Sequence, residues 1–191
     1  MVYVDDHLWD FDLDASLAAI SEERREQALR FKHELGQRQC VLAYLLLKRA
    51  LRTEYGITEN PVFCYGEHGK PLLAGHPGIH FNLSHCREVV ACAVSDRPVG
   101  IDVESVGRYR ESLVRYTMSG QEQQAILGAD NPALAFTCLW TMKEARLKLT
   151  GEGIGHDMAT VLDDTSFHYE TVVSADGRYV YSLCESVLST V

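Results

Sequence analysis

Three carboxylates in two separate segments are the residues of this chain best suited to chemistry. Asp102 and Glu104 lie two residues apart in "PVGIDVES", and Glu144 lies in "WTMKEARLK". Alternate residues of a strand point to the same face, so Asp102 and Glu104 would stand side by side and repel each other. Bound Mg²⁺ would remove this repulsion, because it prefers oxygen ligands and often combines a few carboxylates with substrate phosphates. The alternative is a pair of hydrated carboxylates at an exposed sheet edge.

The third carboxylate belongs to a helical pattern. Trp140, Glu144 and Lys148 are spaced by four residues and therefore share one face of a predicted helix. A Glu four residues before a Lys is common on exposed helix surfaces, but Phe136 and Trp140 make this stripe partly apolar. We therefore expect a partly buried face on which the two charges have a function.

Groups that suit phosphate oxygens lie in two further segments. Ser84 and His85 follow the strand-like "IHFNL", where a hydroxyl, an imidazole and turn N–H groups can bind phosphate. Lys70 lies between Gly69 and Pro71, in a stiff turn that presents one cation. Each segment by itself is more typical of an ordinary turn, so the inference depends on their combination with the carboxylates.

The pattern of apolar and turn-forming residues predicts the elements that position these side chains. Helices are expected after the N-cap Ser21, over 37–55 up to Gly56, over 119–128, and over 131–151. Strands are expected at the N-terminus, in 61–73 before a Gly-rich turn, and over 78–85, 88–96, 98–104, 159–164, 166–174 and 177–186. We expect 78–104 to form one antiparallel meander.

Helices followed by antiparallel strands occur twice along the chain. This order predicts an α+β protein made of two similar halves, residues 1–98 and 99–191.

Composition restricts the class of protein. The chain has 191 residues, 46% of them hydrophobic, and a net charge of −9, which argues against a general nucleic-acid binder. No apolar run is long enough to span a membrane, and the N-terminus lacks the basic region of a signal peptide. Six scattered cysteines without a C-x-x-C pair suit reduced thiols. We therefore expect a cytoplasmic protein that binds neither nucleic acid nor membrane.

A structural zinc site is the alternative metal site in this sequence. Cys64, His68, His76, His80 and Cys86 lie within one region, and His76 and His80 have H-x₃-H spacing. No C-x₂-C pair accompanies them, and such a pair is typical of zinc fingers. The carboxylate site is therefore preferred.

The segments also occur in an informative order, which is "GKP", "FNLSH", "GIDVE", "WTMKEARLK" and a glycine-rich loop at 151–157. In this order they resemble the signature series of the 4′-phosphopantetheinyl transferases, specifically the surfactin-synthetase-activating (Sfp-type) class. The resemblance runs from about residue 21 to about residue 155, with weaker support from "RFKH" at 30–33. It implies two similar α+β halves related by a pseudo-twofold axis, with antiparallel sheets and helices, in a monomer with one site between the halves.

The resemblance implies an enzyme that moves the phosphopantetheine arm of coenzyme A onto a serine of an acyl, peptidyl or aryl carrier protein, with release of 3′,5′-ADP. It implies that Asp102, Glu104 and Glu144 bind Mg²⁺ and that Lys148 contacts the diphosphate. Glu144 is the first candidate to accept the serine proton. The residues implied to bind the phosphates of coenzyme A are Lys70, Ser84, His85 and Lys148, with Arg24 and Arg38 as looser matches.

Other matching positions have supporting or open roles. The resemblance implies that Trp140 and Lys143 support the site, whereas the role of Glu122 stays open. The loop at 151–157 follows a helix, so a helix C-cap is preferred to a phosphate cradle. Arg108, Arg110 and Arg115 are candidates for a basic patch that recognises an acidic carrier, or for an ordinary hydrated loop.

Two other classes of protein are alternatives to this enzyme. A non-catalytic module that binds a carrier or a nucleotide would keep the fold, but the three carboxylates and Lys148 are all present. The trimeric holo-acyl-carrier-protein synthase class, built from a single half, is disfavoured by the length and the two-half pattern.

Overall fold

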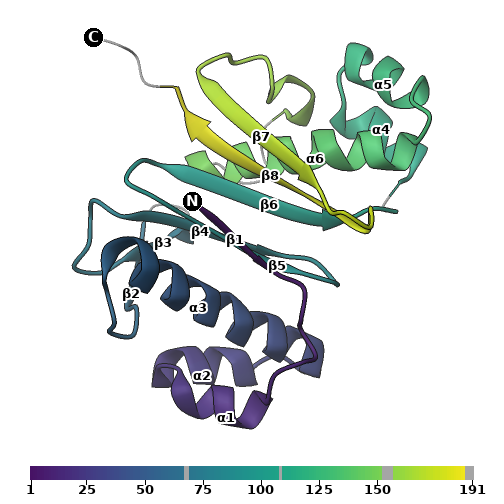
Figure 1. The fold of residues 1–191 in the computed structure, drawn as a ribbon. Helices are drawn as coiled ribbons and strands as arrows, with labels where there is room; N and C mark the ends of the chain where they lie inside the picture. Colours follow the sequence, from purple (N-terminus) through teal and green to yellow (C-terminus); the bar gives the residue numbers. More distant parts are fainter. Residues whose placement is uncertain (67–68, 108, 152–156, 188–191) are drawn as a thin grey trace.

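The computed structural model describes residues 1–66, 69–107, 109–151 and 157–187, which form helices and antiparallel sheets (Figure 1). The predicted α+β class with antiparallel sheets is confirmed. In chain order the elements are β1 (Val2–Asp5), α1 (Leu13–Ala19), α2 (Glu22–Leu29), α3 (Glu34–Tyr55), β2 (Phe63–Tyr65), β3 (Pro71–Leu73), β4 (His80–His85), β5 (Val90–Ser95), β6 (Val99–Ser105), α4 (Glu111–Thr117), α5 (Gly120–Leu127), α6 (Pro132–Thr150), η3 (Met158–Thr160), β7 (Phe167–Val173) and β8 (Tyr179–Ser186).

Two three-stranded antiparallel sheets have the same strand order. The first has the order β1-β5-β4 and the second β6-β8-β7, so in each sheet the last strand in sequence lies between the other two. The strands of the first sheet lie within residues 2–95 and those of the second within residues 99–186, whereas β2 and β3 form a separate two-stranded sheet. The boundary at residue 98 stays a prediction, and the repeated strand order supports it.

The predicted meander over 78–104 is wrong at its third strand. β4 and β5 form a hairpin as expected, but β6 pairs with β8 in the other sheet. The physical reason is that β5 has no vacant edge, because β1 pairs along one side and β4 along the other. The polar turn 96–98 therefore leads the chain to a different sheet.

Short elements account for most of the other differences. α1 and α4 were not predicted, and the second half of 61–73 forms a strand, β3, that pairs with β2. The predicted strand 159–164 is instead the 3₁₀ turn η3, which Asp157 caps by accepting from the Ala159 N–H. Helices of one or two turns carry too few apolar repeats to stand out from loops.

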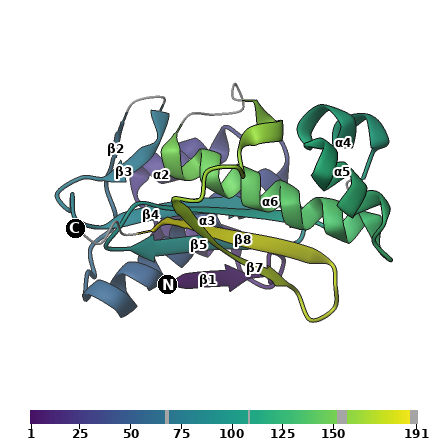
Figure 2. The same ribbon diagram turned by 90° about the horizontal axis from the view of Figure 1, so that it is seen from above.

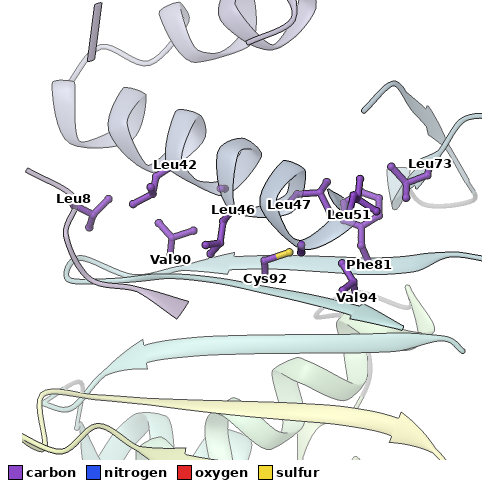
Figure 3. Packing of buried hydrophobic residues seen from close by; sticks show 12 residues of the cluster. Leu8, Leu42, Leu46, Leu47, Leu51, Leu73, Phe81, Val90, Cys92 and Val94 are labelled. Carbon is purple, nitrogen blue, oxygen red and sulfur yellow. The ribbon is translucent and has the colours of Figure 1, made fainter. Parts of the chain in front are cut away.

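The first sheet packs on α3 through a cluster of apolar side chains, part of which Figure 3 shows. Leu47 and Leu51 are 0% and 1% exposed, and α3 ends at Gly56, whose φ of 68° suits a glycine cap. The labelled side chains of α3 point toward those of the sheet: Leu42, Leu46, Leu47 and Leu51 over Phe81, Val90, Cys92 and Val94.

The two sheets share a second apolar layer. Ala91 and Ala93 of β5 pack with Val99, Ile101 and Val103 of β6, all buried. Alternate residues of β6 point the other way, so Gly100, Asp102 and Glu104 face α6. Figure 1 shows the second sheet above the first, and Figure 2 shows α6 running along β6 and β8.

Among the described residues, no helix has the length and apolar character needed to cross a membrane.

Candidate functional site

A pocket lies where β4, β6 and α6 meet. β4 comes from the first sheet, whereas β6 and α6 come from the second half of the chain. The described residues that line the pocket are Leu83, Ser84, His85, Asp102, Glu104, Trp140, Glu144 and Lys148. The structure thus brings the three predicted carboxylates, Lys148, Ser84 and His85 into one pocket.

Gly100 allows α6 to lie directly against β6. A Cβ atom at position 100 would stand 1.9 Å from the backbone oxygen of Ala145 and 2.7 Å from the backbone nitrogen of Leu149. Only glycine fits such an approach without moving the helix. The close contact brings Lys148, one residue before Leu149, to Asp102, two residues beyond Gly100.

Lys148, Asp102 and Ser84 form a compact hydrogen-bonded group. Lys148 Nζ donates to Asp102 Oδ1 at 2.6 Å and to Ser84 Oγ at 2.8 Å. Ser84 Oγ donates to Asp102 Oδ1 at 2.9 Å and accepts from the Val103 N–H at 3.2 Å. These bonds use the one donor and the two acceptor positions of the hydroxyl. Ser84 therefore holds Lys148 and Asp102 in place, and would have to exchange a partner to bind phosphate.

Asp102 retains one unused ligand position. The residue is 4% exposed, and its Oδ2 atom is buried without a hydrogen-bond partner in the described part of the chain. An unsatisfied buried carboxylate oxygen is unfavourable and invites a bound cation or donor. The donor set around it consists of oxygen atoms, which suits Mg²⁺.

The three carboxylates share the pocket but do not form a closed ligand set. Within the described ranges, no three His, Cys, Asp or Glu side chains converge enough to hold a metal ion as they stand. Mg²⁺ needs only one or two carboxylates when substrate phosphates and water complete its shell, so the residues fit a site that substrate completes. The same finding offers no support for zinc at Cys64, His76, His80 and Cys86. His68 of that alternative lies outside the described residues.

His85 is exposed at the pocket on β4. Its pKa is lowered from the ordinary 6.5, chiefly by desolvation from surrounding atoms and then by the positive charges of Lys148 and Arg24. The imidazole is therefore neutral at physiological pH in this state. A bound phosphate would favour the protonated form.

Lys70 reaches the second half without joining the described pocket lining. Its Nζ donates to the backbone oxygen of Leu149 at 2.6 Å, at the C-terminal end of α6. Burial lowers the pKa of Lys70. The Lys70 ammonium is therefore bonded to the residue that follows Lys148 in α6.

The two arginines predicted to bind phosphate are engaged elsewhere. Arg24 donates to the backbone oxygen of Cys40 at 3.0 and 3.2 Å, yet lies near enough to lower the pKa of His85. Arg38 donates to the backbone oxygens of Leu8 and Phe11 and pairs with Glu34 at 2.8 Å. The structure does not bring Arg38 to the pocket.

Lys143 supports α6 and is not among the described residues that line the pocket. It is 0% exposed and donates to Glu122 Oε2 at 2.7 Å, to Met158 O at 2.6 Å and to Thr117 O at 3.3 Å. Glu122 also completes the capping box that begins α5. Lys143 thus joins α6 to α4, α5 and η3, which gives Glu122 a structural role.

Two further expectations concern the loops beside α6 and β6. Gly151 caps α6 with φ 79°, and its N–H donates to Leu147 O at 2.8 Å, which confirms the predicted C-cap. The rest of the glycine-rich loop, 152–156, lies outside the described residues, as does Arg108. Arg110 is the N-cap of α4, and Arg115 pairs with Glu111 at 3.3 Å.

Sequence reasoning missed the roles of Gly100 and Asn82. Asn82 is 7% exposed on β4, and its Oδ1 accepts from the Ile101 N–H of β6 at 2.9 Å. A polar residue between the apolar Phe81 and Leu83 is the signal that could have indicated a buried hydrogen-bond partner.

Comparison with known proteins places this chain among phosphopantetheinyl transferases. A family model described as the 4′-phosphopantetheinyl transferase superfamily matches residues 98–184. Phosphopantetheinyl transferase psf-1 of Bacillus pumilus is 35% identical over 144 residues, 74% of this chain and 62% of that protein. Two such transferases, from Bacillus subtilis and from Bacillus subtilis strain 168 (Sfp), are 31% and 30% identical over 156 residues, in each case 80% of this chain and 70% of the relative.

The chain thus spans about two thirds of the length of these relatives. Among solved structures, the holo-[acyl-carrier-protein] synthase of Thermotoga maritima aligns with a TM-score of 0.35 and 21% identity, over 46% of this chain and 61% of that one. By its identity with relatives of which it covers 70%, the chain belongs to the 4′-phosphopantetheinyl transferase superfamily of enzymes and resembles its Sfp-type members.

Proposed function

We propose that this chain transfers the 4′-phosphopantetheine of coenzyme A to a serine of an acyl, peptidyl or aryl carrier protein, with Mg²⁺, and releases 3′,5′-ADP. The observation that carries the proposal is the pocket in which β4 presents Ser84 and His85 to the carboxylates of β6 and α6. The relatives named above carry this activity in their names.

The carboxylates would hold the metal. Asp102 Oδ2, which has no partner in the described chain, would bind Mg²⁺ together with Glu104 and Glu144. When bound, the ion would neutralise the diphosphate and the charge that develops on its oxygens. The side-by-side arrangement of Asp102 and Glu104 on β6 is then a binding feature instead of an unbalanced repulsion.

Lys148 and His85 would orient the diphosphate and the nucleotide phosphates. An ammonium has three donors, so Lys148 can hold Asp102 and Ser84 and still present one N–H to a phosphate oxygen. His85 would become protonated next to the phosphate and add a second positive charge. Arg24, which lies near His85, and Lys70, which is bonded to the backbone of the residue after Lys148, would add to the positive potential, with Arg38 the least supported member of the set.

Glu144 would accept the proton of the carrier serine, directly or through a water molecule. The serine oxygen then forms a bond to the β-phosphorus of coenzyme A, and the bond from that phosphorus to the bridging oxygen breaks. 3′,5′-ADP leaves with the bonding electron pair. A serine hydroxyl is a poor nucleophile at neutral pH, so a positioned base is required.

We further propose one such site per chain, between residues 1–98 and 99–191, in a monomer that acts in the cytoplasm. The repeated strand order of the two sheets supports the two halves. All six cysteines are free thiols, in keeping with a reducing compartment.

Intact-protein mass spectrometry tests the function. The protein, Mg²⁺, coenzyme A and a panel of apo-carrier proteins are incubated, and the carrier should gain the phosphopantetheine mass. Asp102→Ala and Glu144→Ala should lower the rate by a factor on the order of 1,000 or more, as expected for lost transition-state charge stabilisation. Glu170→Ala, an exposed carboxylate of β7 in the same sheet, is the matched control and should keep the rate.

Two results would contradict the proposal. Transfer to no member of the panel while coenzyme A still binds would favour the non-catalytic module. Undiminished transfer by Asp102→Ala or Glu144→Ala would remove that residue from the metal site.

A further inference from the structure

Two edge strands meet at the pocket, and side chains join them. β4 is the edge of the first sheet and β6 is the edge of the second. Asn82 Oδ1 of β4 accepts from the Ile101 N–H of β6 at 2.9 Å, and Ser84 Oγ accepts from the Val103 N–H at 3.2 Å. We call this pair of contacts the β4–β6 seam.

The spacing of the seam follows from strand geometry. In an antiparallel pair, the N–H groups of every second residue point away from the partner strand. The Ile101 and Val103 N–H groups therefore point from β6 toward β4, away from β8. Asn82 and Ser84, also two residues apart, meet these two donors in register. Without the seam, two buried N–H groups would lose their partners, which is unfavourable.

The two seam residues differ in one respect that matters. Ser84 lines the pocket and touches Lys148 and Asp102 directly. Asn82 is 7% exposed and is not among the described residues that line the pocket. Asn82 contacts the backbone of Ile101, the residue before Asp102. Asn82 can therefore affect the position of Asp102 only through the backbone of β6.

We propose that Asn82 is a positioning residue that fixes β6 against β4. It would thereby set the distance from His85, on β4, to the carboxylates Asp102 and Glu104, on β6. This inference rests on the proposed function, because it assigns the β6 carboxylates to the metal and His85 to the phosphates. The two sets of groups come from different sheets, so the seam, and not a shared backbone ladder, sets their separation. A misplacement of about 1 Å in such a site can lower the rate by about 100-fold.

The proposal predicts different effects on binding of coenzyme A and on binding of the metal. Ser84 and His85 of β4 keep their ladder with β5, and Lys148 keeps its bond to Ser84, so metal-free binding of coenzyme A should change little when Asn82 is replaced. The carboxylates of β6 should shift, so binding of the metal in the presence of coenzyme A should weaken. A general loss of folding would lower both.

The test compares variants of similar shape. Asn82→Leu removes the acceptor, whereas Asn82→Asp keeps an oxygen for the Ile101 N–H. Ser95→Ala is the control, because Ser95 Oγ donates to Glu185 Oε1 at 3.2 Å and so also links the two sheets, through residues that are not among the described pocket lining. Mn²⁺ binding in the presence of coenzyme A is measured by electron paramagnetic resonance, and coenzyme A binding without metal by calorimetry. Transfer rates and thermal unfolding complete the set.

In Asn82→Leu we expect the Mn²⁺ dissociation constant to rise by about tenfold or more and kcat to fall by about 100-fold. Metal-free binding of coenzyme A should stay within about threefold of the unmodified protein, while Asn82→Asp should recover most of both losses. Ser95→Ala should leave Mn²⁺ binding and kcat within about twofold.

Three results would overturn the positioning role. These are Mn²⁺ binding unchanged in Asn82→Leu, equal loss in Asn82→Asp and Asn82→Leu, or equal weakening of Mn²⁺ binding in Ser95→Ala. If the unmodified protein binds Mn²⁺ with coenzyme A yet transfers nothing, the proposed function fails while the Mn²⁺ comparison still decides the role of Asn82.

Discussion

The two long helices pack on sheets of identical strand order, yet they do so with different side chains. α3 contacts the first sheet mainly through leucines, such as Leu47, which belong to an apolar cluster. α6 contacts the second sheet through Gly100, a hydroxyl pair between Thr141 and Ser182 at 2.8 Å, and the ion pair of Lys148 with Asp102. The same architecture therefore stabilises one half and carries the proposed chemistry in the other.

This difference has a physical reason. An apolar helix–sheet interface gains free energy from burial alone and needs no further support. Charged groups in a helix–sheet interface lose hydration, so they must be held by fixed partners. α6 receives this support from Lys143, which ties it to Glu122 and to two backbone oxygens. α3 packs chiefly through apolar contacts and adds a buried hydrogen bond from Gln39 Nε2 to the backbone oxygen of Cys86.

The largest effect on stability is expected from Lys143→Met. The change keeps much of the volume but leaves Glu122 and two backbone oxygens without their cation, which should cost about 3–5 kcal/mol. Urea denaturation measures the loss. The double variant Lys143→Met/Glu122→Gln should regain part of it, and a double variant no more stable than the single one would contradict the pairing.

Leu47→Ala tests the other interface. Leu47 is 0% exposed between α3 and the first sheet, so the cavity should cost about 2–5 kcal/mol of the free energy of unfolding. The transfer rate per folded molecule should stay the same, because no pocket group is touched. A large fall in that rate, at a temperature where the variant is fully folded, would show that the first interface is more than a scaffold.

Gly100→Ala should separate the two kinds of effect. The added Cβ would meet the Ala145 oxygen at 1.9 Å, so α6 must move away from β6. We expect a stability loss of about 1–3 kcal/mol from overpacking. Transfer should fall by about 100-fold, since Lys148 moves away from Asp102. Transfer that falls only in proportion to the unfolded fraction would argue against a need for this close contact.

The smallest expected effect is a pH dependence from His85. Its pKa lies below the ordinary 6.5 in the free protein, and a bound phosphate should raise it, so binding of coenzyme A takes up a proton. Metal-free affinity should therefore increase as the pH falls from about 8 to 6, by at most about tenfold per pH unit. Calorimetry across this range checks it, with His85→Gln as the control. An equal pH dependence in that variant would assign the proton to another group.

The same lowered pKa affects stability. The folded protein disfavours the protonated imidazole of His85 because its pKa is lowered there. The contribution of His85 to the free energy of unfolding is therefore complete above pH 6.5 and is lost as the pH falls toward the folded-state pKa.

Local signals in the sequence were enough to predict the helices that matter for the site. Ser21 caps α2, Gly56 ends α3, and α6 runs between Asn131 and Gly151 as predicted from its cap residues. These signals act within one turn of the helix and are therefore visible in the sequence. The spacing of Trp140, Glu144 and Lys148 also put three pocket residues on one face of α6.

Distant contacts were not visible in the same way. The sheet to which β6 belongs depends on β1, which lies about ninety residues before β5 and occupies the second edge of that strand. Arg38 resembled a phosphate-binding residue, but the carbonyl groups of Leu8 and Phe11 take up its side chain. The seam contact of Asn82 needs two strands from different sheets to be adjacent, which no periodicity in one segment can indicate.

The β4–β6 seam also bears on the order in which the molecule assembles. Each sheet is laddered by strands of its own half, so each can form its backbone hydrogen bonds before the halves meet. The pocket exists only once the two sheets have docked. A partial opening between the sheets would therefore remove the pocket but leave the backbone hydrogen bonds within each sheet intact. In hydrogen exchange under mild denaturant we expect the Ile101 and Val103 amides to lose protection before their neighbours bonded to β8. Binding of coenzyme A would then stabilise the docked arrangement of the two sheets, on which its own binding site depends.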